Sequence, residues 1–518
     1  MSHRGRTRRV YDGLPLRWAA VPRLPLHSGS KLPLVTLPDD AQLLSVPPPL
    51  DPIADVEAAV AEALRYPLTG EPFGAVVTPG ARATVVLQPP ALPLPAVPDD
   101  PRRDALAAVL DELTSAGAAR DRTTILVAGG LGRRLGRREL ETLLRPDRAR
   151  AFRGEVVVHD CESEELRNVA LDDRVVRMHP TLLDADVVVT IGGAESVLHG
   201  GAAALIDACA PGVIRAARAA SLLEPAGASG WRIGTELEAA LRRSTRLIGL
   251  SLVLDRPRTA GLYRGFPWDP DVRAAIGRSP FRRLLNAAPE ILRRRLLDRV
   301  PRELTVLAAL AGPPSVAHAE ALVRGTAVRS VVVDGPFDTL VVPLPWEGIG
   351  LPRTPLNPIT AASLGLGHAL GMWRNRPALA EGGTVVLLHP FPRVMGHGPQ
   401  APYRALFAAL REGTSRQRLG GVEAAAARDR RAIGAYRNGT APHPRQPFAD
   451  WDACALLLER AGSVIVAGCR DAGAARALGL VPSHNASTAL AMARGVAGPG
   501  ARTGVLIGPP YPAVVVGG

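Results

Sequence analysis

Acidic and histidine side chains gather in a glycine-rich loop, residues 192–212, that directly follows an apolar strand-like run. Glu195 and His199 lie close together in this loop with Ser196 between them, and Asp207 follows. A carboxylate near an imidazole is suited to general acid–base chemistry, and α/β proteins place such groups at the carboxyl ends of parallel strands. The pattern predicts a proton-transfer or ligand-binding site, although Glu195 could also be a helix N-cap and Asp207 a solvent-facing residue.

Two further histidines, His389 and His397, lie at the end of the strand-like run 384–390 and in the turn behind it. Their place at a strand end makes both catalytic candidates, and the alternative is that they are ordinary polar residues of a Pro/Gly-rich turn. The chain contains neither G-x-S-x-G nor H-E-x-x-H, the signatures of serine hydrolases and zinc proteases. Its four cysteines are scattered and give no zinc or disulfide pattern.

A second glycine-rich loop, residues 129–136, follows a strand and opens a predicted helix. Gly130, Gly132 and Gly136 could bring backbone N–H groups close to a pyrophosphate, and Asp160 ends the next strand, where an acidic residue can bind a ribose. This pattern supports an NAD(P)-binding interpretation. The alternative is that the glycines only form a tight turn, because dinucleotide-binding folds usually begin with this unit and here a helical segment precedes it.

The basic excess of the chain, +13, comes almost entirely from arginine, and Lys31 is its only lysine. Nucleic-acid binders usually combine arginine with lysine and aromatic residues, so we attribute the excess to GC-rich codon usage and expect no nucleic-acid partner. A lysine-anchored cofactor would have only Lys31 to use. We find no signal peptide and no apolar run of membrane-spanning length, so we expect a cytoplasmic protein without membrane contact.

Short β-branched runs alternate with helical stretches, which predicts an α/β fold of two domains with mostly parallel sheets and a cleft between them. The predicted strands are 83–90, 123–128, 155–160, 186–191, 246–255, 330–335, 339–345, 384–390 and 463–468. The main predicted helices are 55–66, 100–113, 137–144, 403–411, 451–461 and 487–494. The last two strand-like runs, 503–508 and 513–518, could belong to either domain.

The domain organisation follows from changes in composition along the chain. Residues 1–50 are rich in Pro and Arg and predict a poorly ordered arm or an extended edge, followed by a first α/β domain over 51–270. Residues 271–300 form a basic helical connector, and 301–518 form the second α/β domain.

In the connector, we expect three consecutive arginines, Arg293, Arg294 and Arg295, to form a solvated face. We expect its apolar residues to pack inward; these are Leu284, Leu285, Ile291, Leu292, Leu296 and Leu297.

The order of the loops resembles the nickel-pincer lactate racemase family over most of the chain from about residue 55. "ILVAGGLGRRL" and "ADVVVTIGGAES" followed by "APG" match the second and third strand–loop units of that family. "EGGTVVLLHPFPRVMGHG" is similar to its Glu-Gly-Gly-Thr strand and Gly-His-Gly turn, and "LVPSHNASTALAMA" to its C-terminal part. The resemblance implies a two-domain α/β fold, racemase or epimerase activity on 2-hydroxy acids, and a nickel-pincer nucleotide as the cofactor.

The side chains depart from the family pattern where the chemistry takes place. The family acid and arginine of the first loop fall on Gln88 and Ala91, and the two catalytic histidines fall on Gly132 and Val197. The lysine that carries the cofactor falls on Asp207, and the nickel-binding histidine falls near Leu222. Family residues retained by this alignment are Arg133, Glu195 and Ser196. The resemblance therefore implies a chain without pincer cofactor or metal, a candidate pseudoenzyme.

Three functions remain open from the sequence. The first is a divergent racemase-family protein that binds a small acidic ligand, held by Arg133 and Arg134, or has a rebuilt site around His199, His389 and His397. The second is an NAD(P)-dependent enzyme that uses the 129–136 loop. The third is a regulatory or partner protein that docks through the basic connector. The sequence is also compatible with a homo-oligomer.

Overall fold

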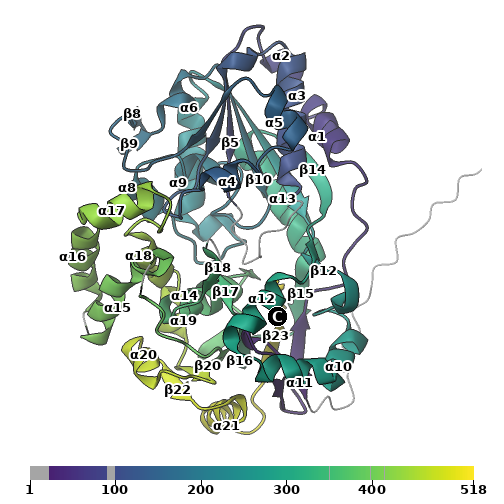
Figure 1. Ribbon diagram of the computed structural model, residues 1–518, viewed down its shortest axis with the longest axis vertical. Coiled ribbons are helices and arrows are strands. Elements are labelled where there is room, and N and C mark those ends of the chain that lie inside the picture. Colours follow the sequence, from purple (N-terminus) through teal and green to yellow (C-terminus); the bar gives the residue numbers. More distant parts are fainter. Residues whose placement is uncertain (1–22, 90–99, 349–350, 397, 414, 518) are drawn as a thin grey trace, which may run out of the picture.

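Two mostly parallel β-sheets organise the chain, one in the upper half and one in the lower half of Figure 1. This computed structural model describes residues 23–89, 100–348, 351–396, 398–413 and 415–517. Helices lie between and around the strands of both sheets. The predicted α/β class with two mostly parallel sheets is confirmed.

The first sheet has the strand order β14-β11-β10-β5-β6-β7 among the described residues, and only β14 runs antiparallel to its neighbour. Its strands are β5 (Ala83–Leu87), β6 (Thr123–Val127), β7 (Glu155–Val158), β10 (Val187–Gly193), β11 (Arg246–Leu254) and β14 (Val306–Gly312). Its helices are α1 (Val56–Arg65), α2 (Phe73–Val76), α3 (Arg102–Ser115), α4 (Arg137–Leu140), α5 (Pro146–Ala151), α6 (Pro180–Asp184), α7 (Ala203–Ile206), α8 (Pro211–Ala216), α9 (Ser229–Leu241) and α13 (Pro314–Arg329).

Alternation along the central strand β10 explains why this sheet is covered on both faces. Val187 and Val189 join the apolar cluster that includes α1 and α3, whereas Val188 joins the cluster that includes α7 and α9. Successive side chains of a strand point to opposite faces, so a fully apolar strand must be buried on both. All residues of β10 are buried.

The second sheet has the order β22-β21-β20-β16-β23-β4, and β2 also pairs with β16. All of these pairings are parallel. Its strands are β2 (Ser28–Gly29), β4 (Gln42–Ser45), β16 (Phe337–Pro345), β20 (Leu379–Leu388), β21 (Ser463–Ala467), β22 (Val481–Ser483) and β23 (Thr503–Ile507). Its helices are α14 (Pro358–Ala362), α15 (Tyr403–Arg411), α16 (Arg416–Ala426), α17 (Arg430–Arg437), α18 (Gln446–Asp452), α19 (Ala455–Arg460), α20 (Ala472–Ala477) and α21 (Ala486–Ala497).

Several short strands lie outside these two sheets. A parallel three-stranded sheet joins β15, β24 and β19, and four other short pairs are antiparallel. These strands are β1 (Leu24–Pro25), β3 (Leu34–Val35), β8 (Arg167–Ala170), β9 (Val175–Met178), β12 (Arg258–Thr259), β13 (Arg302–Glu303), β15 (Ser330–Val333), β17 (Glu347–Gly348), β18 (Leu351–Pro355), β19 (Trp373–Arg374) and β24 (Ala513–Val516).

The division of the chain between the sheets differs from the predicted boundaries. The predicted N-terminal arm contributes β4 and β2 to the second sheet, so the extended-edge interpretation describes residues 28–45. At the other boundary, β14 pairs with β11 although it lies beyond residue 301, and α13 packs on the same strand. The two last strands remain with the second part of the chain, because β23 lies between β16 and β4, and β24 pairs with β15. The sequence could not show these pairings because they join distant segments.

The connector consists of α10 (Pro270–Arg278), α11 (Pro280–Ala287) and α12 (Glu290–Asp298), and its predicted orientation is wrong. Leu284 and Ile291 are each 69% exposed, whereas Arg293 is 4% exposed and donates to the Ser30 hydroxyl at 3.0 Å. Arg294 lies over the Trp346 ring and pairs with Glu290. Packing against residues 28–32 therefore selects the arginine face of these helices. Of the predicted apolar members, Leu285 is buried.

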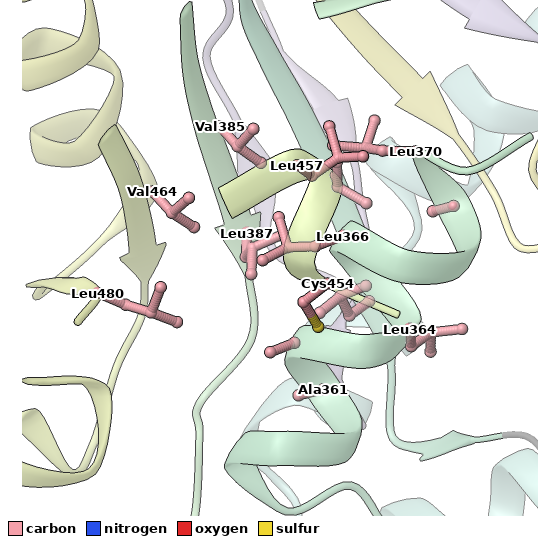
Figure 2. Close-up of a cluster of buried hydrophobic side chains, with 14 of the residues drawn as sticks. Ala361, Leu364, Leu366, Leu370, Val385, Leu387, Cys454, Leu457, Val464 and Leu480 are labelled. Atoms are coloured by element: carbon pink, nitrogen blue, oxygen red, sulfur yellow. The ribbon is translucent and has the colours of Figure 1, made fainter. Parts of the chain in front are cut away.

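The apolar core of the second domain forms around an irregular helix (Figure 2). Helix α14 continues into a π-helical segment, Ser363–Ala369, and Figure 2 shows Leu366 of this segment between the strand residue Leu387 and Cys454. Leu364 and Leu370 of the same stretch, with Val385 and Leu457, also line this core. These side chains belong to one buried cluster. A π-turn is often found at functional sites, and this one carries His368.

No helix in the described part of the chain has the length and apolar character needed to cross a lipid bilayer.

Candidate functional site

The carboxyl ends of β5 and β10 carry the predicted polar residues, as expected for a parallel sheet. Gln88 directly follows β5 and connects two loops: its side-chain oxygen accepts from Gly200 N at 2.7 Å, and its amide nitrogen donates to Asp207 Oδ2 at 2.5 Å. Gln88 is 1% exposed, whereas Asp207 keeps partial solvent exposure. The loops that begin at Gln88 and Glu195 are thus joined in one polar network.

Asp207 ends α7 and lies against the turn at Gly130. Burial raises the pKa of Asp207 to about 7, and the hydrogen bond from Gln88 opposes this rise. Gly130 has a φ of +54°, and a Cβ at this position would lie 2.5 Å from Asp207 Oδ1. The turn therefore needs glycine for its backbone and for space. A carboxyl group that titrates near neutrality suits proton exchange or hydrogen bonding to an acid.

Glu195 is a buried carboxylate inside a charged network. Arg102 Nη1 lies 3.5 Å from Glu195 Oε1, and Arg102 also donates to Asp100. Burial opposes the charge of Arg102, but Asp100 and Glu195 outweigh burial and raise the pKa of this guanidinium. His199 Nδ1 lies 3.5 Å from Glu195 Oε2. Asp100 also accepts from Arg102 N at 3.0 Å, just where α3 begins at Arg102.

His199 is held as a donor to the backbone. Its Nε2 lies 2.6 Å from Pro89 O, and because a carbonyl oxygen can only accept, Nε2 carries the proton. Burial lowers the pKa of His199, and the charge of Glu195 opposes this shift. The Nδ1 atom thus faces the Glu195 carboxylate. The structure brings the predicted pair Glu195 and His199 together.

Ser196 and the adjacent glycines support a second histidine rather than a ligand. His318 of α13 donates from Nε2 to Ser196 O at 2.9 Å, and its Nδ1 lies 3.3 Å from the Ser251 hydroxyl. A Cβ at Gly200 would lie 2.3 Å from the His318 ring. His318 is completely buried and bonded at both nitrogens, so it fixes the loop.

The sequence analysis missed His368, which approaches the same place from the second domain. Burial lowers the pKa of His368 to about 4, and the negative charge of Glu195 opposes this shift, so the two groups interact electrostatically. His368 retains partial solvent exposure. Close to His368 in the chain, the two domains are in direct contact, because Leu222 N donates to Gly371 O at 2.9 Å. No strand-end signal marks His368, because it lies in a π-helical segment that we did not predict.

Arg133 and Arg134 do not face a free ligand position. Arg133 pairs with Glu139 and donates to Gly439 O at 3.3 Å, and Arg134 donates to Arg437 O at 2.7 Å and to Val158 O at 2.8 Å. Both guanidinium groups are therefore used to join the first domain to α17 and the turn behind it. Their role as ligand-binding residues stays a prediction.

The 129–136 loop is covered by the second domain in the same way. Tyr436 donates to Gly130 O at 3.3 Å, His443 N donates to Leu131 O at 2.9 Å, and Gly132 N closes the turn on Gly129 O at 2.9 Å. The helix that Gly136 opens, α4, has four residues. Asp160 pairs with Arg437 at 2.9 Å. These contacts favour the tight-turn interpretation of the loop over dinucleotide binding.

The remaining predicted histidines lie elsewhere. His389 ends β20 as predicted, is 1% exposed, and accepts from Phe391 N at 3.1 Å. Its neighbours are Gly29 and Arg294, so it lies at the edge of the second sheet under the N-terminal segment and the connector. No contact joins it to Glu195 in the described structure. His397 lies outside the described residues.

The positions aligned with the family's metal site are close together and apolar. Val197 N donates to Leu222 O at 2.8 Å, so the two positions on which the second catalytic histidine and the nickel-binding histidine were expected to fall lie side by side. Val197 is completely buried. The only lysine, Lys31, is exposed and lies by the connector, where its neighbour Leu32 accepts from Arg282. Among the described residues, no group of three or more His, Cys, Asp or Glu could hold a metal ion.

Comparison with known proteins identifies this arrangement. Residues 29–206 match the family model described as the lactate racemase N-terminal domain. The solved lactate racemase apoprotein from Thermoanaerobacterium thermosaccharolyticum is similar over 95% of this chain and 99% of its own, with 16% identity and a TM-score of 0.59. A protein from Thermotoga maritima matches with 11% identity, 90% and 100% coverage, and a TM-score of 0.46. The search of curated proteins found no match.

The family match covers the loops that carry Gln88, Glu195 and His199, and the fold match extends over both domains. In the sequence, the strand–loop pattern of this region resembled the units of the racemase family. The N-terminal part of the chain thus matches the lactate racemase N-terminal domain, and the chain as a whole has the fold of a lactate racemase apoprotein.

Proposed function

We propose that this chain is a divergent lactate racemase family member that does not carry the nickel-pincer cofactor and binds a small acidic ligand where its two domains meet. The observation that carries the proposal is Asp207, which stands at the family's lysine position and is held by Gln88. A carboxyl group cannot form the covalent link that the amine provides. The residues present therefore do not fit the cofactor.

The other cofactor positions support the same conclusion. Val197 and Leu222 offer no metal donor atoms in their side chains, and Gly132 has no side chain to act as a base. Without a hydride acceptor, the remaining residues cannot racemise a 2-hydroxy acid by the family reaction. Loss of one acid–base group alone typically costs about 10²–10⁴ in rate.

What remains is a set of groups that can bind and exchange protons. Glu195 interacts with one histidine from each domain, His199 and His368, and Asp207 titrates near neutrality in the adjoining network. Partial exposure of His368 and Asp207 gives a ligand a route to these groups. A protonated Asp207 could donate a hydrogen bond to a carboxylate, so binding should strengthen as the pH falls below about 7.

Cofactor loading tests the first half of the proposal. The chain would be expressed with the enzymes that make and insert the family cofactor, with the Thermoanaerobacterium thermosaccharolyticum racemase as a positive control. We expect the intact mass of the unmodified chain and no stoichiometric nickel. A covalent adduct with nickel would overturn the proposal.

Calorimetric titration with D-lactate and L-lactate at pH 6 and pH 8 tests the second half. We expect tighter binding at pH 6 and about tenfold weaker binding in His368→Gln, because one buried polar contact is lost. His484→Gln, an exposed histidine of the second domain, is the matched control. No binding of either lactate, or equal binding by both variants, would contradict this assignment. Titration with NAD(H) would identify the dinucleotide alternative, and the regulatory alternative predicts no small-ligand binding.

A further inference from the structure

Arg256 is a buried cation whose hydrogen-bonding capacity is mostly unused. It follows β11, is 1% exposed, and is among the largest completely buried side chains. Its Nη2 donates to Pro48 O at 2.7 Å. Its Nε and Nη1 atoms have no hydrogen-bond partner in the part of the chain that the structure describes. A buried charge without partners is strongly unfavourable, so such groups in native proteins usually have an acceptor or a ligand.

The surroundings of Arg256 carry an excess of positive charge. The buried carboxylate Asp255 accepts from Arg256 N at 2.8 Å and from Arg258 Nη2 at 2.8 Å, whereas its Oδ1 lies 3.6 Å from Arg256 Nε, beyond hydrogen-bond distance. Arg329, 7% exposed, interacts electrostatically with Arg256 and with Asp255. Arg256 and Arg258 thus lie by this one carboxylate, whereas Arg329 interacts more strongly with Glu195 than with Asp255 and donates to Ala194 O at 2.8 Å.

This cationic cluster lies where three connections between the domains meet. The first connection passes Pro48 between β4 and α1, and the second leaves β11 through Asp255. The third returns toward β14, and there Asp255 N donates to Thr305 O at 2.9 Å. An anion at Arg256 would therefore touch the crossing point of both domains.

We propose that Arg256, with Arg258 and Arg329 around it, binds a small oxyanion, a phosphate or carboxylate group, at this crossing point. The Nη1 atom supplies two free N–H donors and Nε supplies one, and Arg258 Nε is also without an acceptor. Guanidinium groups pair well with both kinds of oxyanion. The site is centred on Arg256, borders the Glu195 network through Arg329, and does not depend on the loss of the pincer cofactor.

The test uses the full chain and inorganic phosphate at constant ionic strength. We expect saturable binding by calorimetry and a rise in the thermal midpoint, both lost in Arg256→Met. Arg243→Met removes an exposed arginine and is the matched control, which should bind like the original chain. His368→Gln should also leave phosphate binding unchanged, which separates this site from the proposed lactate site. Acetate in place of phosphate distinguishes a carboxylate preference from a phosphate preference.

Absence of saturable binding by phosphate and acetate, or equal binding by Arg256→Met, would overturn the proposal. If Arg256→Met does not fold, the phosphate affinity of Arg256→Lys and crystals of the original chain test the proposal instead. Lysine keeps the charge but has fewer donors in a different geometry, so at least a fivefold weaker phosphate affinity is expected. Crystals containing selenate should show an anomalous peak beside the Arg256 guanidinium, and a water or protein acceptor there instead would contradict the assignment.

Discussion

The side-chain nitrogen of Gln88 lies 2.5 Å from Asp207 Oδ2, so an amide and a carboxyl group face each other across two loops of one sheet edge. Gln88 also accepts from Gly200 N at 2.7 Å. The place of Asp207 is therefore linked through Gln88 to the loop that carries Glu195 and His199.

The pH dependence of stability should report Asp207. Its pKa is about 7 in the folded chain and near 3.8 when unfolded, so the folded state binds the proton more tightly. Its contribution favours folding at low pH and is lost as the pH rises from about 4 to about 7. Asp207→Asn keeps an acceptor for Gln88 and should raise stability at pH 8 by about 1–2 kcal/mol, with little change at pH 4. Urea unfolding at both pH values measures this, with the exposed Asp39→Asn as control. A loss of stability at pH 8 would contradict it.

Gly130→Ala should destabilise the chain for two separable reasons. Its φ of +54° is strained for alanine, and the new Cβ would meet Asp207 Oδ1 at 2.5 Å. We expect a loss of about 2–3 kcal/mol in urea unfolding. Gly80→Ala also has a positive φ, +77°, but no atom within 4 Å, so it isolates the backbone cost at about 1 kcal/mol. Equal losses in both variants would show that the steric contact is unimportant.

Removing the carboxylate of Glu195 should cost more than neutralising it. Glu195→Ala leaves the buried Arg102 with only Asp100, and breaking such a pair typically costs about 3–5 kcal/mol. Glu195→Gln keeps an acceptor, so a smaller loss is expected. The difference between the two urea midpoints is the measurement. If Glu195→Ala lost less than about 1 kcal/mol, the buried network would not stabilise the loop.

Tyr436→Phe tests how the second domain holds the 129–136 loop. The hydroxyl donates to Gly130 O and accepts from Cys161 N, both at 3.3 Å, and Tyr436 is completely buried. Phenylalanine would leave Cys161 N without this acceptor, at a cost of about 1–2 kcal/mol. Protection of the loop amides in hydrogen exchange should fall. The exposed Tyr66→Phe is the control, and unchanged protection in Tyr436→Phe would refute this role.

The repeating parts of the fold were predictable because local patterns determine them. Strands such as β10 and β11 and helix α15 occur close to their predicted bounds, since apolar runs and helical spacing are local signals. The pairing of β4 with β23 and the pairing of β11 with β14 were not predictable, because each joins segments that are distant in sequence. The prediction for the connector was wrong for another reason. Arg293 is buried against the hydroxyl of Ser30, and periodicity alone cannot distinguish which face of a helix packs.

The candidate site was predictable only where residues share one loop. Glu195 and His199 are neighbours in sequence and in space, and the strand end before them was a clear signal. The contacts of Arg133 and Arg134 could not be predicted, because their partners, Gly439 and Arg437, come from the other domain. His368 was missed because it lies in a π-helical segment without a recognisable motif.

The position of β4 at the edge of the second sheet also determines the order in which the two domains can fold during synthesis. β4 is made before the first domain, but its partner β23 leaves the ribosome only after the whole first domain. The first domain can collapse while the chain is still growing, whereas the second must wait with an unpaired strand exposed. Refolding of the second domain should therefore be the slower and more aggregation-prone step.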